Sequence, residues 1–98
     1  MMTPEGRVKA EIKAYLTSLG AYQFWPVQTG YGAATVDCLA CLRGRFLAIE
    51  VKRPGIKKGT VRQEKVLKEV REARGFGIVV DDVAQLRAWL DRPLEAHN

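Results

Sequence analysis

The sequence predicts an α/β protein in which helices flank a mixed central sheet. Three observations lead to this prediction. Residues 4–19 repeat apolar side chains at helical spacing, residues 46–52 alternate side-chain type as a strand does, and residues 76–80 form a short apolar run. An apolar run without alternation is typical of a strand buried on both faces and paired in parallel. The expected element order along the chain is αβββαβα.

The first expected helix has Thr3 as its N-cap and Pro4 at its first helical position, and Gly20 ends it. Residues 22–27 follow as an aromatic-rich strand that Pro26 closes, and a loop with two glycines leads to the next strand. Tyr31 of this loop has two open interpretations: it stacks on a base or sugar, or it packs against its own loop. The helix has a clear buried stripe, formed by Val8, Ile12, Tyr15, Leu16 and Leu19.

Residues 37–42 and 46–52 are expected to form a hairpin, because Arg43-Gly44 is the turn signal between them. A two-residue loop here pairs residue 42 with residue 45, and the same ladder brings Asp37 opposite Glu50. Directly opposed side chains have Cβ atoms roughly 5 Å apart, so two carboxylates repel each other unless a cation lies between them. Lys52 follows Glu50 by two residues and therefore returns to the same face.

The remaining elements follow a basic loop at residues 53–59. Thr60 and Gln63 fit a capping box at the start of a second helix, which runs to the glycine at position 75. Residues 76–80 are the buried strand. Asp82 caps a last helix that Pro93 ends, and we expect the tail beyond it to fray.

The composition indicates one folded domain spanning residues 1–98, with 47% hydrophobic residues. Sixteen Lys and Arg against eleven Asp and Glu give a net charge of +5, which fits a polyanionic partner and also simply aids solubility. No apolar run approaches the ~20 residues that span a bilayer, and the first residues are too polar for a signal peptide. We therefore expect no membrane partner and a location in the cytoplasm of a bacterial or phage-infected cell.

Cys38 and Cys41 form a C-x-x-C pair. On a strand, positions three apart point to opposite faces, so the two thiols cannot bind one metal without a break in the strand. We interpret both as small core residues and expect no zinc or redox role.

Asp37, Glu50 and Lys52 resemble the Asp…Glu-x-Lys signature of the restriction-endonuclease-like nucleases. A longer ordered set of motifs, at residues 3–5, 29–32, 43–46, 49–55, 60 and 63, more closely resembles the virus-type replication–repair nuclease (VRR-NUC) domain. The chain departs from that pattern at Val36, where the family usually has proline before the aspartate. The resemblance implies a restriction-endonuclease-like αβββαβ core, with a C-terminal helix added, and a metal-dependent nuclease.

Asp37 and Glu50 are the expected metal ligands, and the resemblance implies the carbonyl of Val51 as a third. Oxygen donors without histidine or thiolate favour Mg²⁺ or Mn²⁺ over zinc. Lys52 is expected to position or deprotonate the attacking water, or to stabilise charge on the scissile phosphate. The alternative to a catalytic role is a structural one, in which Glu50 and Lys52 form a surface ion pair on an exposed sheet face.

Two further residues match the family's site. Glu5, in the first helix, is expected as an additional acidic group, with Glu11 as the alternative. A structural interpretation of Glu5 is that its charge only stabilises the N-terminus of the helix. The capping-box residue Gln63 also matches a site glutamine, whose amide would hold the lysine or a water. The structural and catalytic interpretations of Gln63 are compatible.

Basic residues are expected to surround the site and to contact phosphates, so that DNA is recognised by shape and not by base sequence. Similarity to Holliday-junction resolvases implies a structure-selective endonuclease for branched or nicked DNA that works as a homodimer. The alternative is a non-catalytic DNA-binding module of the same fold, which would bind with steep salt dependence and yield no metal-dependent product. The expected contact residues are Arg43, Arg45, Arg53, Lys57, Lys58, Arg62 and Lys65.

Overall fold

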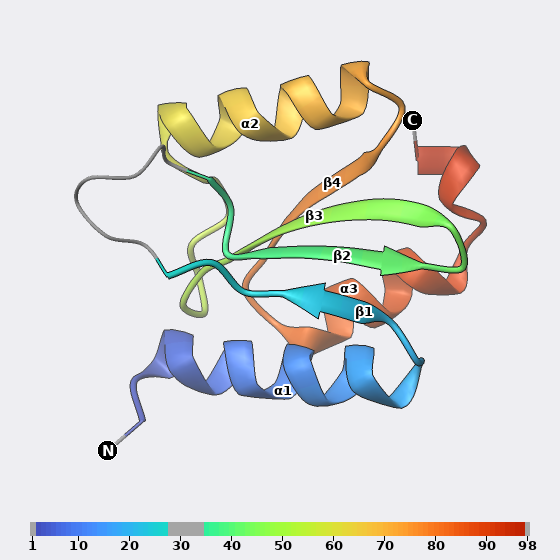
Figure 1. Cartoon of the computed structure of the whole chain (residues 1–98). Coiled ribbons are helices and arrows are strands. Elements are labelled where there is room, and N and C mark those ends of the chain that lie inside the picture. The colour runs from blue at the N-terminus through green and yellow to red at the C-terminus, as the bar shows by residue number, and fades with distance from the viewer. Residues whose placement is uncertain (1, 28–34, 98) are drawn as a thin grey trace.

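The computed structural model describes residues 2–27 and 35–97, so the loop motif at residues 29–32, with Tyr31, lies outside the described residues. Figure 1 shows the arrangement of the elements. They are α1 (Pro4–Ser18), β1 (Tyr22–Phe24), β2 (Cys38–Leu42), β3 (Arg45–Val51), α2 (Val61–Glu72), β4 (Phe76–Val80), α3 (Val83–Asp91) and a 3₁₀ turn, η1 (Leu94–His97).

The four strands form one sheet in the order β1-β2-β3-β4. β2 is antiparallel to both of its neighbours, whereas β3 and β4 are parallel, so the predicted mixed sheet is confirmed. The hairpin register is also as predicted, with Leu42 opposite Arg45. Both turn residues have positive φ, 52° at Arg43 and 80° at Gly44, the sign pattern of a type I′ turn that matches strand twist.

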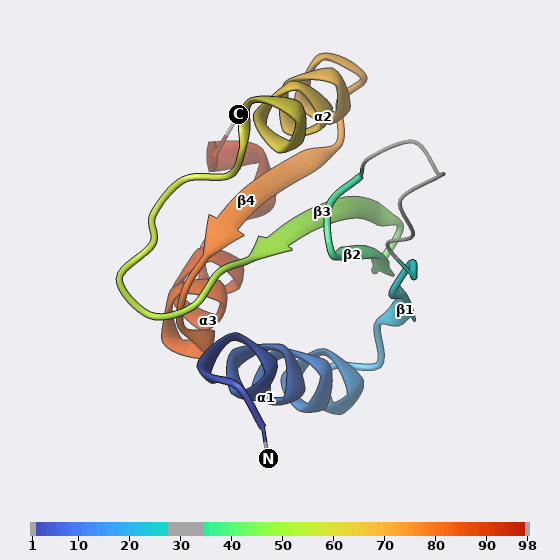
Figure 2. The ribbon, with the colours of Figure 1, turned by 90° about the vertical axis from the view of Figure 1, so that its left-hand side faces the viewer.

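The helices cover the sheet on two sides, with α1 and α3 on one face and α2 on the other (Figures 1 and 2). Alternation along β3 divides its side chains between these layers. Leu47, Ile49 and Val51 join the larger core cluster beneath α1 and α3. Ala48 packs instead with Val36 and with Leu67 of α2. Both faces of this central strand are therefore buried, as a parallel pairing favours.

Val36, which stands where the family has proline, has no exposed surface and belongs to the core beneath α2. Its side chain therefore fixes the entry to β2 by packing.

Three expectations need correction. The tail does not fray after Pro93, because Leu94 is buried in the larger core and Glu95 forms an ion pair with Arg45. β1 is three residues long, shorter than expected, and among the strands of the described residues it pairs with β2 alone.

The third correction concerns the cysteines. They point to opposite faces as predicted, but only Cys38 is a core residue, since Cys41 is exposed. Burial, with the nearby Asp37 charge, raises the pKa of the Cys38 thiol to about 12. Within residues 2–27 and 35–97, no helix has both the length and the apolarity needed to cross a membrane.

Candidate active site

The structure brings Asp37 and Glu50 together at one end of the β2–β3 hairpin. Asp37 lies just before β2, and Glu50 is next to last in β3, so the antiparallel pairing places them at the same end. The Asp37 backbone N–H donates to Glu50 Oε1 at 3.1 Å, and the Val51 backbone N–H donates to Asp37 Oδ2 at 2.9 Å. These two bonds hold the carboxylates in a fixed relation.

Glu50 is deeply buried, with 2% of its surface exposed. Burial and the charge of Asp37 raise the pKa of Glu50 to about 7, although Lys52 opposes the rise. The alternative of an ion pair on an exposed sheet face is therefore wrong about the location, although the Glu50–Lys52 contact itself exists. A carboxylate held in this environment favours a nearby positive charge.

Lys52 connects Glu50 with the start of α2. Its Nζ lies 3.1 Å from Glu50 Oε2 and donates to Gln63 Oε1 at 2.8 Å. The same amide oxygen accepts from the Thr60 backbone N–H at 2.8 Å, and the Gln63 N–H donates to Thr60 Oγ1 at 3.2 Å. The capping box and the contact with the lysine are thus both present.

A second lysine, which the sequence did not indicate, reaches the pair from α1. Lys9 Nζ lies 3.2 Å from Asp37 Oδ1 and 3.2 Å from Glu5 Oε2. Burial opposes the charged form, but the two carboxylates outweigh it and raise the pKa of Lys9. Glu5 is therefore linked to Asp37 through Lys9. The one available signal was the spacing of Lys9, one helical turn after Glu5.

The donor set of this site suits a hard divalent cation. Each carboxylate gives one oxygen to a backbone N–H and turns the other toward a lysine ammonium, so both free oxygens face positive charge. The described residues contain no group of three or more His, Cys, Asp or Glu that could hold a metal. A cation at Asp37 and Glu50 would need a carbonyl oxygen and waters as further ligands, as Mg²⁺ commonly has.

The basic residues divide between the two ends of the molecule. Arg43 and Arg45 lie at the hairpin turn, five residues of β3 away from Glu50, which is about 17 Å at 3.3 Å per residue. The expectation that these two arginines surround the site is therefore wrong. The other expected residues follow β3 or open α2, at the site's end of the sheet: Arg53, Lys57, Lys58, Arg62 and Lys65.

Asp81, another residue that the sequence reasoning missed, anchors the loop after β3. It accepts from the Gly55 N–H at 2.7 Å, pairs with Lys57 Nζ at 3.0 Å and accepts a short bond from Gln85. The bonds from Gly55 and Lys57 lower the pKa of Asp81 to about 2. Lys57 thus has a structural partner, Asp81, in the loop that follows β3.

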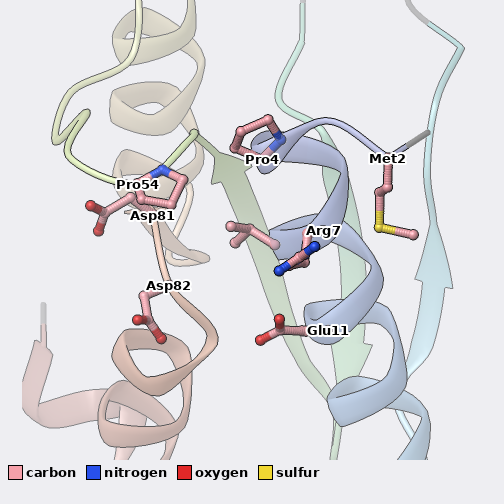
Figure 3. A pocket seen from close by; sticks show the side chains of 8 residues that line it. Met2, Pro4, Arg7, Glu11, Pro54, Asp81 and Asp82 are labelled. Carbon is pink, nitrogen blue, oxygen red and sulfur yellow. The ribbon is translucent and has the colours of Figure 1, made fainter.

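A hollow of about 350 Å³ lies between the start of α1 and the β4–α3 junction (Figure 3). Neither carboxylate of the pair lines it, so it is separate from the candidate site. Glu11, the alternative acid, lines this hollow and does not join Asp37. The lining residues are Met2, Pro4, Arg7, Val8, Glu11, Pro54, Asp81 and Asp82.

Comparison with known proteins supports the assignment of the fold. No protein-family model matches the sequence, and no curated protein matches it. A solved structure described as a VRR_NUC domain matches with a TM-score of 0.77 and 26% sequence identity, over 92% of this chain and 97% of that chain. Because the match covers nearly all of both chains, the resemblance seen in the sequence is confirmed. The chain therefore has a restriction-endonuclease-like α/β fold and is similar over nearly its whole length to a VRR_NUC domain.

Proposed function

We propose that the protein is a metal-dependent, structure-selective DNA endonuclease that hydrolyses phosphodiester bonds, in the manner of a Holliday-junction resolvase. The observation that carries this proposal is the pair of buried Glu50 and partly buried Asp37, with Lys52 alongside. A design for stability alone would avoid a carboxylate whose pKa is raised to about 7 by burial and by a second carboxylate. The same arrangement is useful where a cation and a phosphate must meet.

In this proposal Asp37 and Glu50 hold Mg²⁺ or Mn²⁺, with the carbonyl of Val51 as a further ligand. The bound ion would neutralise charge on the scissile phosphate and favour ionisation of water near neutral pH. Asp37 keeps its orientation through the Val51 N–H, because that bond uses Oδ2; the cation would take the place of Lys9 Nζ at Oδ1.

Lys52 positions the attacking water or stabilises charge on the phosphate. Gln63 holds the ammonium from the side of α2 and thereby keeps Nζ next to Glu50. Glu5 and Lys9 act indirectly. Lys9 forms ion pairs with both Glu5 and Asp37, and its positive charge sets the electrostatic environment of Asp37.

The test uses three variants that preserve side-chain size: Asp37→Asn, Glu50→Gln and Lys52→Met. Each is expected to abolish Mg²⁺- or Mn²⁺-dependent cleavage of nicked, flap, fork or four-way DNA while DNA binding and folding persist. Glu69→Gln, an exposed change on α2, is the matched control and should cleave normally. Unchanged cleavage by Glu50→Gln would overturn the proposal.

The rival, a non-catalytic DNA-binding module, predicts the same binding without any metal-dependent product. A wild-type protein that binds branched DNA and leaves it intact with both ions would favour this rival. The burial of Glu50 beside a second carboxylate and a lysine counts against it, because DNA binding alone needs no buried acid.

We further propose that the protein forms a homodimer through an apolar surface on β1 and the neighbouring strands. Tyr22, Phe24 and Phe46 are 71%, 54% and 48% exposed, and the register places them on one sheet face. Exposed aromatic clusters of this kind commonly mark interfaces. Phe24→Lys should give a monomer by light scattering where the wild type is a dimer, and a monomeric wild type would refute the idea.

A further inference from the structure

Two arginines occupy backbone conformations that arginine disfavours. Among the described residues, Arg43 and Arg74 are the non-glycine residues with positive φ, at 52° and 74°. Left-handed backbone is far more favourable for glycine or asparagine than for arginine. The turn and the helix end require these conformations but not arginine, so the choice of arginine at both positions is a reason to look for a function.

Arg74 stands just past the end of α2, where helices usually place glycine. Its N–H donates to the Arg71 carbonyl at 3.0 Å, and the next N–H, of Gly75, donates to the Val70 carbonyl at 2.8 Å. This is the bonding of a helix end that favours glycine at the left-handed position. The glycine stands one residue later, because a Cβ at Gly75 would lie 2.7 Å from Val70 Cγ1. Arginine at 74 therefore contributes nothing that the helix end needs.

Both arginines lie at the end of the sheet opposite the carboxylates. Arg74 borders a hollow of about 750 Å³ that Arg45 also lines, and Arg45 Nη1 donates to the Arg43 carbonyl at 3.1 Å. The chain thus concentrates guanidinium groups around the hairpin turn and the end of α2.

The carboxylates near this hollow already have partners. Glu95 pairs with Arg45 at 2.5 Å, and Glu72 pairs with Lys68 at 3.8 Å. Arg43 and Arg74 are exposed, and neither forms an ion pair with a described residue. Their charges are available to an anionic partner.

We propose that Arg43 and Arg74 form a distal arginine pair that binds the phosphate backbone of one duplex arm of the DNA. The proposal rests on the nuclease function proposed above and specifies its substrate. The pair lies about 17 Å from the carboxylates, by the length of β3 between them. Successive phosphates on one strand rise about 3.4 Å along the helix axis, so an arm must extend about five base pairs beyond the cut to reach the pair.

α2 connects the two ends of this path. It has 12 residues, about 18 Å of helix, and runs from the Lys52 contact to the distal arginine pair. Two exposed basic side chains on the helix, Arg62 and Lys65, continue the positive surface between the two contacts.

The test is the double variant Arg43→Asn/Arg74→Gly, which removes both charges and installs residues suited to left-handed backbone. We expect its midpoint in urea to be no lower than that of the wild type. Its affinity in EDTA for nicked DNA with an arm of about twelve base pairs should fall at least tenfold. The slope of log affinity against log salt should decrease by about 2, at about 0.9 per phosphate contact.

An arm of about four base pairs is too short to reach the pair, so wild type and variant should bind that substrate equally. The charge-matched control is Lys13→Ala/Arg87→Ala, on α1 and α3 at the other face of the sheet, and it should keep the wild-type slope.

A wild-type slope in the distal variant, or an arm-length dependence that survives in it, would overturn the proposal. Loss of binding together with a lowered urea midpoint would also count against it, since it would show that the arginines support the fold. The two proposals fail separately. Wild-type cleavage with an unchanged slope in the variant removes the distal pair alone, whereas arm-dependent binding without cleavage removes the nuclease alone.

Discussion

Replacing Glu50 with glutamine should stabilise the protein at the pH where the site is expected to work. The pKa of this carboxyl rises from 4.5 to about 7, first because it is buried and then because Asp37 is close. The folded state therefore binds the proton more tightly than the unfolded chain does. As pH rises from about 4.5 through 7, the free energy of unfolding must fall.

The size of this effect follows from the two pKa values. The difference between about 7 and 4.5, at about 1.4 kcal/mol per pKa unit, gives about 3.5 kcal/mol lost when Glu50 ionises. Glutamine has the shape of the protonated acid and keeps an oxygen for the Asp37 N–H. Glu50→Gln should therefore gain about 2–3 kcal/mol over the wild type at about pH 8, and almost nothing at about pH 4.

Urea unfolding in EDTA, measured from about pH 4 to about pH 8, checks this expectation, with Glu69→Gln as the exposed control. The difference in the free energy of unfolding between wild type and Glu50→Gln should increase as pH rises from about 4.5 to 7. A variant that is less stable than the wild type at about pH 8, or a difference independent of pH, would refute the reasoning. A stabilised variant that no longer cleaves DNA would show stability given up for activity.

Three further outcomes are expected. Asp81 has a folded pKa of about 2, so its contribution to stability is present above about pH 4 and is lost as pH falls toward 2. In Asp81→Asn, the free energy of unfolding, measured in urea, should therefore fall less steeply as pH is lowered from about 4 toward 2. Gly75→Ala should cost about 1–3 kcal/mol in urea unfolding, because its Cβ would lie 2.7 Å from Val70 Cγ1. Finally, a thiol reagent should label the exposed Cys41 in the native protein and reach the buried Cys38 only on unfolding; equal labelling would contradict the burial.

The parts of the structure that could be predicted from the sequence depend on local geometry. A two-residue turn fixes the register of a hairpin, so placing Arg43-Gly44 in the turn was enough to bring Asp37 to Glu50. The contact between Gln63 and Thr60 likewise follows from spacing within one helical turn.

The parts that could not be predicted depend on how elements dock. Lys9 reaches Asp37 only because α1 crosses the sheet beside the start of β2, and no periodicity encodes that placement. The bond between Arg45 and Glu95 joins residues 50 positions apart and orders a tail that looked free. Cys41 is exposed because α2 packs on β3 and β4 and leaves the outer strands uncovered.

The misplacement of Arg43 and Arg45 had a different origin, because nearness in sequence was taken for nearness in space. A strand separates its two ends by several residues of extended backbone, so the residue that enters β3 cannot share a site with the residue that leaves it.

Gln63 Oε1 accepts hydrogen bonds from both the Thr60 N–H and the Lys52 ammonium. The stability of the α2 N-terminus is therefore coupled to the position of the lysine charge. Anyone who engineers the beginning of α2 for greater heat resistance will also move the lysine. In this domain, the stability of the α2 start and the position of the Lys52 ammonium cannot be adjusted independently.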